Sequence, residues 1–227
     1  MNFLVPDKIY TLNGVTVYQK LLPDGEKWKD PEKAKAAGFE PDDLYKANRP
    51  LSGDGRARGV TIHNTDKIRV PEGTTMAEQY VRATFNENMR SARVHFYVCD
   101  TCAWQELRTD EVGWHAGDGK GDGNGTTLSL ELIMSGEKDE YNARTRDNGA
   151  RIAAALLYEN GLTPDDLYTH TYFINQKNGF TSPDRREQNT HHIEGIFKYC
   201  PLYILRDSWD GFEALVRTYF DALSAGK

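Results

Sequence analysis

Alternating apolar and polar residues near the N-terminus predict a β-hairpin. The two alternating segments are Ile9–Leu12 and Val15–Tyr18, and they flank Asn13-Gly14. Both turn residues tolerate a positive φ angle, which a two-residue hairpin turn requires. We therefore expect two antiparallel strands joined at this turn.

A short helix is expected after the hairpin. Asp30 is a suitable N-cap, Pro31 fits the first helical position, and Gly38 supplies a stop. Hairpin and helix together make residues 1–50 an N-terminal extension, in which no functional pattern is visible.

From residue 51 onward, strand-like and helix-like periodicities alternate along the chain. Short β-branched or alternating runs predict strands at 59–63, 94–98, 127–134 and 167–170. Apolar residues at helical spacing, or flanking caps, predict helices at 76–89, 146–160 and 208–223. Strands interleaved with helices predict an α/β fold built around one sheet. A polar, Asn-rich stretch from about Phe173 to Lys198 is longer than most loops of compact domains.

Length and charge narrow the possible functions. The chain has 227 residues, enough for one elaborated domain, and 28 basic against 34 acidic side chains give a net charge of −6. No Lys/Arg-rich stretch is present, so neither nucleic acid nor an anionic membrane surface is an expected partner. No apolar run reaches the roughly 20 residues of a membrane-spanning helix, and the first residues lack a secretory signal pattern. Synthesis in the cytoplasm without a signal peptide is expected.

Two histidines and one cysteine stand where a catalytic metal site would need them. His63 and His170 each end a short apolar strand, and strand ends are where α/β sheets hold their ligands. Cys200 follows Lys198 by two residues, and a nearby cation favours the thiolate form that binds zinc. Three such ligands would leave a fourth position open, as catalytic zinc sites do. A lone histidine is more often structural, so the inference depends on all three together.

Glu131 is a carboxylate inside an otherwise apolar strand. Burying it would cost several kcal/mol, by a rough estimate, unless it is paired or faces a cleft. Strand alternation equally permits an exposed face for this residue. The alternation pattern alone is compatible both with a catalytic role for Glu131 and with an exposed, non-functional position.

Six motifs in order make the chain resemble the zinc-dependent N-acetylmuramoyl-L-alanine amidases of the type 2 amidase family. This family includes phage and prophage endolysins and is related to peptidoglycan recognition proteins. The resemblance covers about residues 51–227, and its motifs are Thr61–Thr65, Gly113–Gly119, Asn124, Ser129–Leu132, Thr169–Phe173 and Lys198–Pro201.

The resemblance implies a central mixed β-sheet flanked by helices and a role for each motif residue. The implied zinc ligands are His63, His170 and Cys200. Glu131 resembles the carboxylate that takes a proton from the attacking water, and Lys198 resembles the cation that steadies the developing oxyanion. The expected substrate groove is lined by Asn64, Trp114, His115 and Asn124.

One connection departs from the family pattern, and one pair of cysteines needs a separate interpretation. The connection between the second and third ligands is long, so residues 174–197 are expected to be an insertion, and it contains His191-His192. His192 is a rival second ligand, although His170 has the better framework because it ends a strand. The pair Cys99 and Cys102 could be half a metal site or a redox pair, but two reduced thiols in a turn is the simpler interpretation.

The expected activity is hydrolysis of the amide between N-acetylmuramic acid and L-alanine in peptidoglycan. Without a signal peptide, such an enzyme would reach the wall after phage or prophage lysis. Two alternatives stay open, namely a non-catalytic peptidoglycan-binding protein of the same fold and a structural metal with His192 as fourth ligand. Phage or host origin, stem-peptide preference and oligomeric state are not determined by the sequence.

Overall fold

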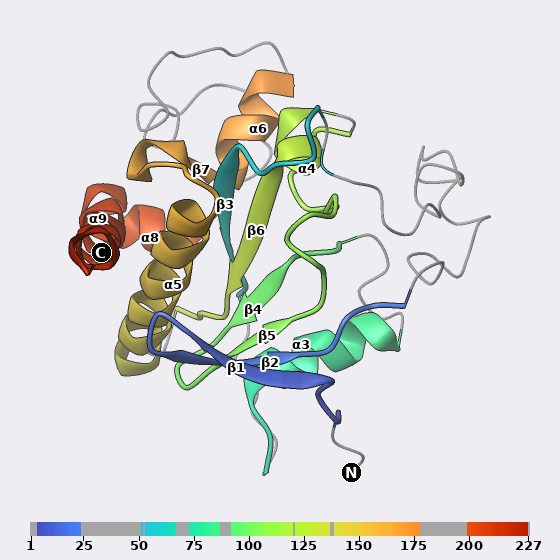
Figure 1. The fold of residues 1–227 in the computed structure, drawn as a ribbon. Coiled ribbons are helices and arrows are strands. Elements are labelled where there is room, and N and C mark those ends of the chain that lie inside the picture. The colour runs from blue at the N-terminus through green and yellow to red at the C-terminus, as the bar shows by residue number, and fades with distance from the viewer. Residues whose placement is uncertain are drawn as a thin grey trace.

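A seven-stranded mixed sheet forms the centre of the protein (Figure 1). The computed structural model describes residues 4–23, 51, 53–66, 73–86, 92–119, 121–136, 139–177 and 199–226. Its strands are β1 (Lys8–Leu12), β2 (Val15–Gln19), β3 (Gly59–Asn64), β4 (Phe96–Val98), β5 (Ala103–Gln105), β6 (Thr127–Leu132) and β7 (Leu167–Thr169). They lie in the order β1-β2-β5-β4-β6-β3-β7. The pairs β1/β2 and β4/β5 are antiparallel and the other neighbours are parallel, so the predicted mixed sheet is confirmed.

The N-terminal hairpin forms as predicted, with Asn13 at φ 46° and Gly14 at φ 84°. It is joined to the sheet, because β2 pairs in parallel with β5 and Val17 lies opposite Ala103. The extension therefore supplies one edge of the sheet that also carries the candidate metal ligands. The helix expected at residues 31–38 lies outside the described residues.

The described helices are α3 (Met76–Phe85), α4 (Asp122–Thr126), α5 (Asp139–Glu159), α6 (His170–Lys177), α8 (Leu202–Asp207) and α9 (Trp209–Ala225), and a 3-10 turn, η1, covers Pro164–Asp166. The side-chain hydroxyls of Thr75 and Ser208 cap α3 and α9. Helix α5 begins seven residues before the predicted start at residue 146. Helices α4, α6 and α8 were not predicted. None of the helices in this part of the chain has the length and apolar character needed to cross a bilayer.

The end of β7 differs from the prediction by one residue. The strand stops at Thr169, and His170 is the first residue of α6. The helix continues through residue 177, so the first four residues of the expected insertion belong to it. The hydroxyl of Thr169 accepts a hydrogen bond from the backbone N–H of Tyr172, which explains why the chain turns into a helix there.

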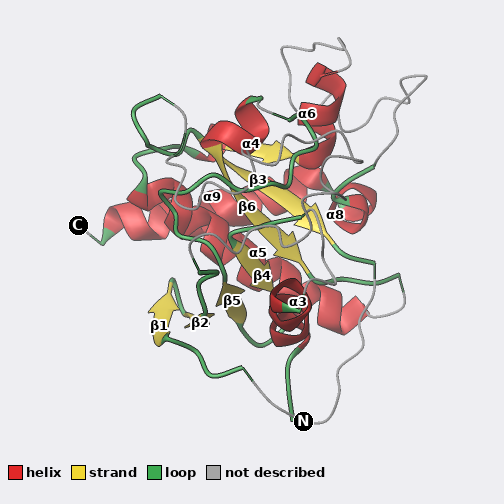
Figure 2. Cartoon of the chain, turned by 90° about the vertical axis from the view of Figure 1, so that its right-hand side faces the viewer, coloured by secondary structure: helices red, strands yellow, loops and turns green. Residues whose placement is uncertain are grey.

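Helices lie on both faces of the sheet, as Figure 2 shows. On one face, Leu128, Leu130 and Leu132 join the main core with the buried side of α5. A Cβ on Gly149 of α5 would lie 2.5 Å from Leu132, so the close approach of this helix to β6 requires a glycine. Alternate residues of β6 point to the opposite face, where α3 covers β4 and β5 but leaves β3 and β6 available for a site.

Candidate metal centre

Three residues far apart in sequence form a compact cluster of metal-binding atoms. His63 of β3, His170 of α6 and Cys200 before α8 each offer one atom, and these atoms all lie within 4.8 Å of one another. Nδ1 of His63 is 3.1 Å from Nδ1 of His170 and 3.9 Å from Sγ of Cys200. All three side chains are buried. The structure thus brings together the three residues that the sequence suggested as ligands.

The donor set and its dimensions fit zinc. Bond lengths of about 2.0–2.1 Å to nitrogen and 2.3 Å to sulfur give a tetrahedron with edges of roughly 3.3–3.6 Å. The observed separations of 3.1 and 3.9 Å bracket those edges. Two imidazoles and one thiolate leave one tetrahedral position for water or substrate, as in catalytic sites. His191, His192 and Lys198 lie outside the described residues, so His192 as a rival ligand and the role of Lys198 both stay predictions.

Thr171 fixes the backbone of Cys200. Its hydroxyl accepts a hydrogen bond from the Cys200 N–H at 2.9 Å and donates to the Cys200 carbonyl at 3.1 Å. The Thr171 N–H also donates to that carbonyl, at 3.1 Å. The peptide bond from Cys200 to Pro201 is cis. Because Thr171 follows His170 directly, the second and third candidate ligands are held to each other by three backbone contacts.

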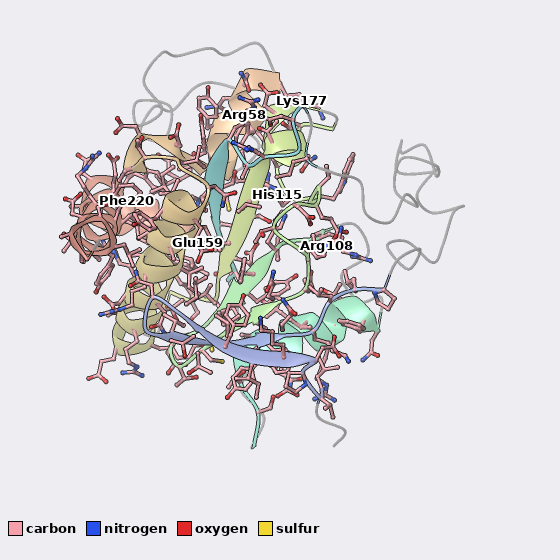
Figure 3. All side chains as sticks on the ribbon, viewed as in Figure 1. Arg58, Arg108, His115, Glu159, Lys177 and Phe220 are labelled. Atoms are coloured by element: carbon pink, nitrogen blue, oxygen red, sulfur yellow. The ribbon has the colours of Figure 1, made fainter. Side chains whose placement is uncertain are left out.

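His115 contacts the first candidate ligand from the other side. Its Nδ1 lies 3.1 Å from Nε2 of His63, while Nδ1 of His63 faces His170. Figure 3 labels His115 in the loop before α4, beside the sheet. Burial lowers the pKa of His115 well below its usual range, and the positive charges of His95 and His170 act in the same direction. A neutral His115 can accept the proton of the His63 Nε2–H, which fixes the tautomer with Nδ1 free to bind metal.

Asn124 holds the loop that carries His115. Its Oδ1 accepts hydrogen bonds from the N–H groups of His115 (2.7 Å) and Ala116 (2.8 Å), and its Nδ2 donates to the Gly119 carbonyl at 2.9 Å. The carboxylate of Asp118 accepts hydrogen bonds from two N–H groups of the first turn of α4, those of Gly123 and Asn124. Burial raises the pKa of Asp118 despite these contacts. The Asn124 amide is thus used to support the site.

Asn64 and Trp114, which are adjacent in sequence to His63 and His115, take part in hydrogen bonds with the backbone. Oδ1 of Asn64 accepts a hydrogen bond from the Tyr203 N–H at 3.0 Å, and its Nδ2 donates to the Thr65 carbonyl. The backbone of Trp114 exchanges two hydrogen bonds with Arg93. Substrate contact by Asn64, Trp114, His115 and Asn124 is untested by these contacts and stays a prediction.

Glu131 lies beside the cluster on the same face of the sheet. It is opposite His63 in the β3/β6 register and opposite Tyr97 in the β4/β6 register, and it is partly buried. Tyr80 of α3 is a further neighbour that sequence reasoning assigned only to the helix core. Burial raises the pKa of Tyr80, and the negative charges of Glu131 and Asp66 add to that rise, whereas a hydrogen bond with Thr65 lowers it.

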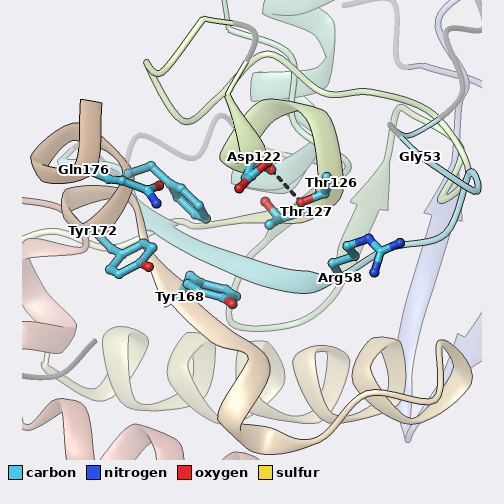
Figure 4. Close-up of a pocket in the computed structure, with 9 residues that line it drawn as sticks. Gly53, Arg58, Asp122, Thr126, Thr127, Tyr168, Tyr172 and Gln176 are labelled. Carbon is cyan, nitrogen blue, oxygen red and sulfur yellow. Dashed lines mark hydrogen bonds between the residues drawn. The ribbon is translucent and has the colours of Figure 1, made fainter. Parts of the chain in front are cut away.

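A separate pocket lies at the N-terminal ends of β3 and β6, away from the metal cluster at their C-terminal ends (Figure 4). It has a volume of about 380 Å³, and its lining includes Arg58 and Thr127, which stand at the start of β3 and β6. Tyr168 and Tyr172 supply aromatic walls. His63 and Glu131 are at the far ends of these strands, so this pocket is distinct from the metal cluster.

Sequence comparisons with known proteins agree on one family. The sequence profile of the family described as N-acetylmuramoyl-L-alanine amidase matches residues 53–187. The chain is 27% identical over 155 residues to the N-acetylmuramoyl-L-alanine amidase XlyA of Bacillus subtilis (strain 168). The aligned region covers 68% of this chain and 42% of XlyA. It is 30% identical over 128 residues to CwlH, an amidase of the same name from that strain, covering 53% of this chain and 49% of CwlH. The chain therefore spans less than half the length of these curated relatives.

Solved structures support the fold. The catalytic domain of XlyA superimposes with a TM-score of 0.59 at 24% identity, covering 89% of this chain and 99% of that domain. The structure of PlyL gives a TM-score of 0.58 at 20% identity, with 89% and 98% of the two chains covered. The central mixed sheet flanked by helices is therefore the architecture that the resemblance implied.

Proposed function

The chain belongs to the N-acetylmuramoyl-L-alanine amidase family, and on that premise we propose that it hydrolyses the amide between N-acetylmuramic acid and L-alanine of peptidoglycan. Residues 51–227 would be the catalytic domain, with an insertion at about 174–197. The observation that carries the proposal is the buried cluster of two imidazoles and one thiol beside a carboxylate. This combination is suited to hydrolysis by activated water.

We propose that zinc is held by His63, His170 and Cys200. When bound, zinc lowers the pKa of a coordinated water to about 7 and polarises a carbonyl group. His115 supports this by holding His63 in the tautomer whose Nδ1 faces the site. The donor set of one thiolate and two imidazoles favours zinc over magnesium or calcium, which prefer oxygen ligands.

Glu131 is proposed as the general base. Its place opposite His63 in the sheet register brings a carboxylate next to the ligand cluster. It would accept a proton from the attacking water and then deliver that proton to the leaving amine of L-alanine. Lys198 is proposed to stabilise the negative charge that develops on the substrate carbonyl oxygen.

Substrate contact is proposed for the loop that carries Trp114 and His115, together with Asn64 and Asn124. In support, His115 contacts His63, and Asn124 holds the His115 backbone. Asn64 follows His63 in the chain, and Trp114 precedes His115. Peptidoglycan would be the partner. Release to the cell wall after phage or prophage lysis is proposed from the resemblance to endolysins.

The test is a digest of purified bacterial sacculi with the zinc-loaded protein. We expect new L-alanine amino termini, no new reducing sugar ends, and loss of activity after exhaustive chelation that zinc restores. Glu131→Gln should lower the hydrolysis rate by at least about 100-fold, as removal of a general base does. The matched control is Glu140→Gln, because that side chain is 94% exposed on α5.

The rival function is peptidoglycan binding without catalysis. It predicts that the protein sediments with sacculi while no amino termini appear, with or without zinc. Full activity of Glu131→Gln, or of the chelated protein, would overturn the mechanism even if the substrate were correct.

A further inference from the structure

The proposed hydrolysis leaves two cysteines without a role. Cys99 follows β4 and Cys102 precedes β5, so they flank the two-residue turn of this hairpin. Both are free thiols and both are buried, with exposures of 0% and 3%. Among the described residues, the one cluster of three or more candidate metal ligands is the His63 site, so nothing near this pair completes a metal site.

The backbone holds the two cysteines at a separation that a disulfide can bridge. Cys99 and Cys102 continue the antiparallel β4/β5 register beyond Val98 and Ala103, and the Cys99 N–H donates to the Cys102 carbonyl at 2.9 Å. Residues opposite each other in an antiparallel ladder have Cα atoms about 4.5–5.5 Å apart, inside the range of roughly 4.4–6.8 Å found for disulfides. The sulfurs are 3.6 Å apart. A bond of about 2.05 Å requires the two sulfurs to approach each other by about 1.5 Å.

The two thiols have unequal environments. A hydrogen bond from the Cys102 thiol lowers the pKa of Cys99 to about 6, and contacts with Thr101 act in the same direction. The same hydrogen bond, together with burial, raises the pKa of Cys102, which keeps its proton. Cys102 also lies 3.6 Å from the hydroxyl of Thr75, the N-cap of α3. The pair therefore has the character of one attacking thiolate and one resolving thiol.

We propose that Cys99 and Cys102 form a dithiol site that a hydroperoxide oxidises to an intramolecular disulfide. Burial favours an oxidant as small as hydrogen peroxide over a bulky disulfide, since a bulky one would have to open the turn to reach sulfur. The Cys99 thiolate attacks one peroxide oxygen, the O–O bond breaks, and Cys99 sulfenic acid and hydroxide result. The Cys102 thiol then attacks the sulfenic sulfur, and its proton leaves with the departing hydroxide as water. Overall, two thiols and one hydrogen peroxide give one disulfide and two waters.

The test uses the full chain loaded with zinc and treated with graded hydrogen peroxide. After quenching, the protein is denatured, alkylated with iodoacetamide and cut with trypsin. Both cysteines fall in the peptide Val94–Arg108, which has no internal Lys or Arg, whereas Cys200 falls in a separate peptide. We expect the Val94–Arg108 peptide to lose both alkylation sites and about 2 Da, and to regain both sites after dithiothreitol.

Two variants make the result specific. With Cys102→Ser, Cys99 should stop at sulfenic acid, trapped by dimedone, or proceed to sulfinic acid without a loss of 2 Da. With Cys99→Ser, Cys102 should keep its alkylation site at the same peroxide concentration. The proposal fails if the wild-type peptide keeps two alkylatable thiols under peroxide that fully oxidises added glutathione, or if oxidation links two chains. Because the readout is peptide mass, it stands apart from amidase activity.

Discussion

Replacing Glu106 by glutamine should stabilise the protein in alkaline solution and have little effect in acid. Glu106 follows β5 and is fully buried. Burial raises its pKa to about 8, because loss of water outweighs the nearby positive charge of Arg93 and the weaker influence of Thr84 and the Val94 backbone. In the unfolded chain the same carboxyl ionises near pH 4.5. The folded protein therefore holds a proton that the unfolded chain releases.

The sign and size of the effect follow from proton linkage. Between about pH 4.5 and 8 the unfolded state binds one proton fewer at this site, so the free energy of unfolding falls by about 1.4 kcal/mol for each pH unit. The stability that the neutral carboxyl contributes is fully present below about pH 4.5 and is lost as the pH rises to about 8. Over the whole window this amounts to at most about 5 kcal/mol. Glutamine is neutral at every pH and has nearly the same shape, so it removes this dependence.

The assay is urea denaturation at half-unit steps from pH 5 to 9, with chelator present so that metal binding does not contribute. The difference in unfolding free energy between Glu106→Gln and wild type should grow with pH and level off above about pH 8. Glu140→Gln is the control, because its exposed side chain should give a difference that does not change with pH. A pH-independent difference for Glu106→Gln would refute the reasoning.

Three other substitutions test the supports of the site and the core. His115→Phe should weaken zinc binding by about 10–100-fold in competition with a chromophoric chelator, whereas an unchanged affinity would exclude its role in orienting the first ligand. Thr171→Val removes the hydroxyl that binds the Cys200 backbone twice, so it should cost about 1–3 kcal/mol in urea unfolding and also weaken zinc binding. Thr218→Val, at an exposed position of α9, is its control, and equal losses in the two variants would contradict the clamp. Gly149→Ala should destabilise the protein by about 1–3 kcal/mol, because its Cβ would lie 2.5 Å from a β6 side chain, and an unchanged urea midpoint would show that α5 can move away.

Local periodicity was sufficient for most of the fold. The hairpin at Asn13-Gly14 and the start of α3 are decided by neighbours in sequence, and both were predicted. Helix α4 (Asp122–Thr126) was missed because its glycines and asparagine have low helix propensity, and its first turn depends on the carboxylate of Asp118. The pairing of β2 with β5 was also invisible, since it joins segments more than 80 residues apart.

The candidate site, too, was predicted only in part. The sequence indicated the three candidate ligands because two histidines follow strands and a cysteine lies near a lysine, and the structure brings these residues together. It gave no sign that Tyr80 lies near Glu131, because α3 and β6 are joined only through the folded sheet. It also gave no sign of the contact between His115 and His63, whose distance depends on how the loop is held.

The buried polar residues around the cluster explain why the motifs are spread over so much of the chain. A zinc site tolerates errors of only a few tenths of an ångström in its ligand atoms, so each ligand needs its own support. Asn124 holds the loop of His115, and Thr171 holds the backbone of Cys200. Asn64 follows His63, and its Oδ1 accepts a hydrogen bond from the Tyr203 N–H in the first turn of α8. This bond connects the end of β3 to the segment after Cys200. Removing one of these amides or hydroxyls would leave all three ligand side chains present but less firmly positioned. We therefore expect weaker metal binding more than a loss of substrate affinity.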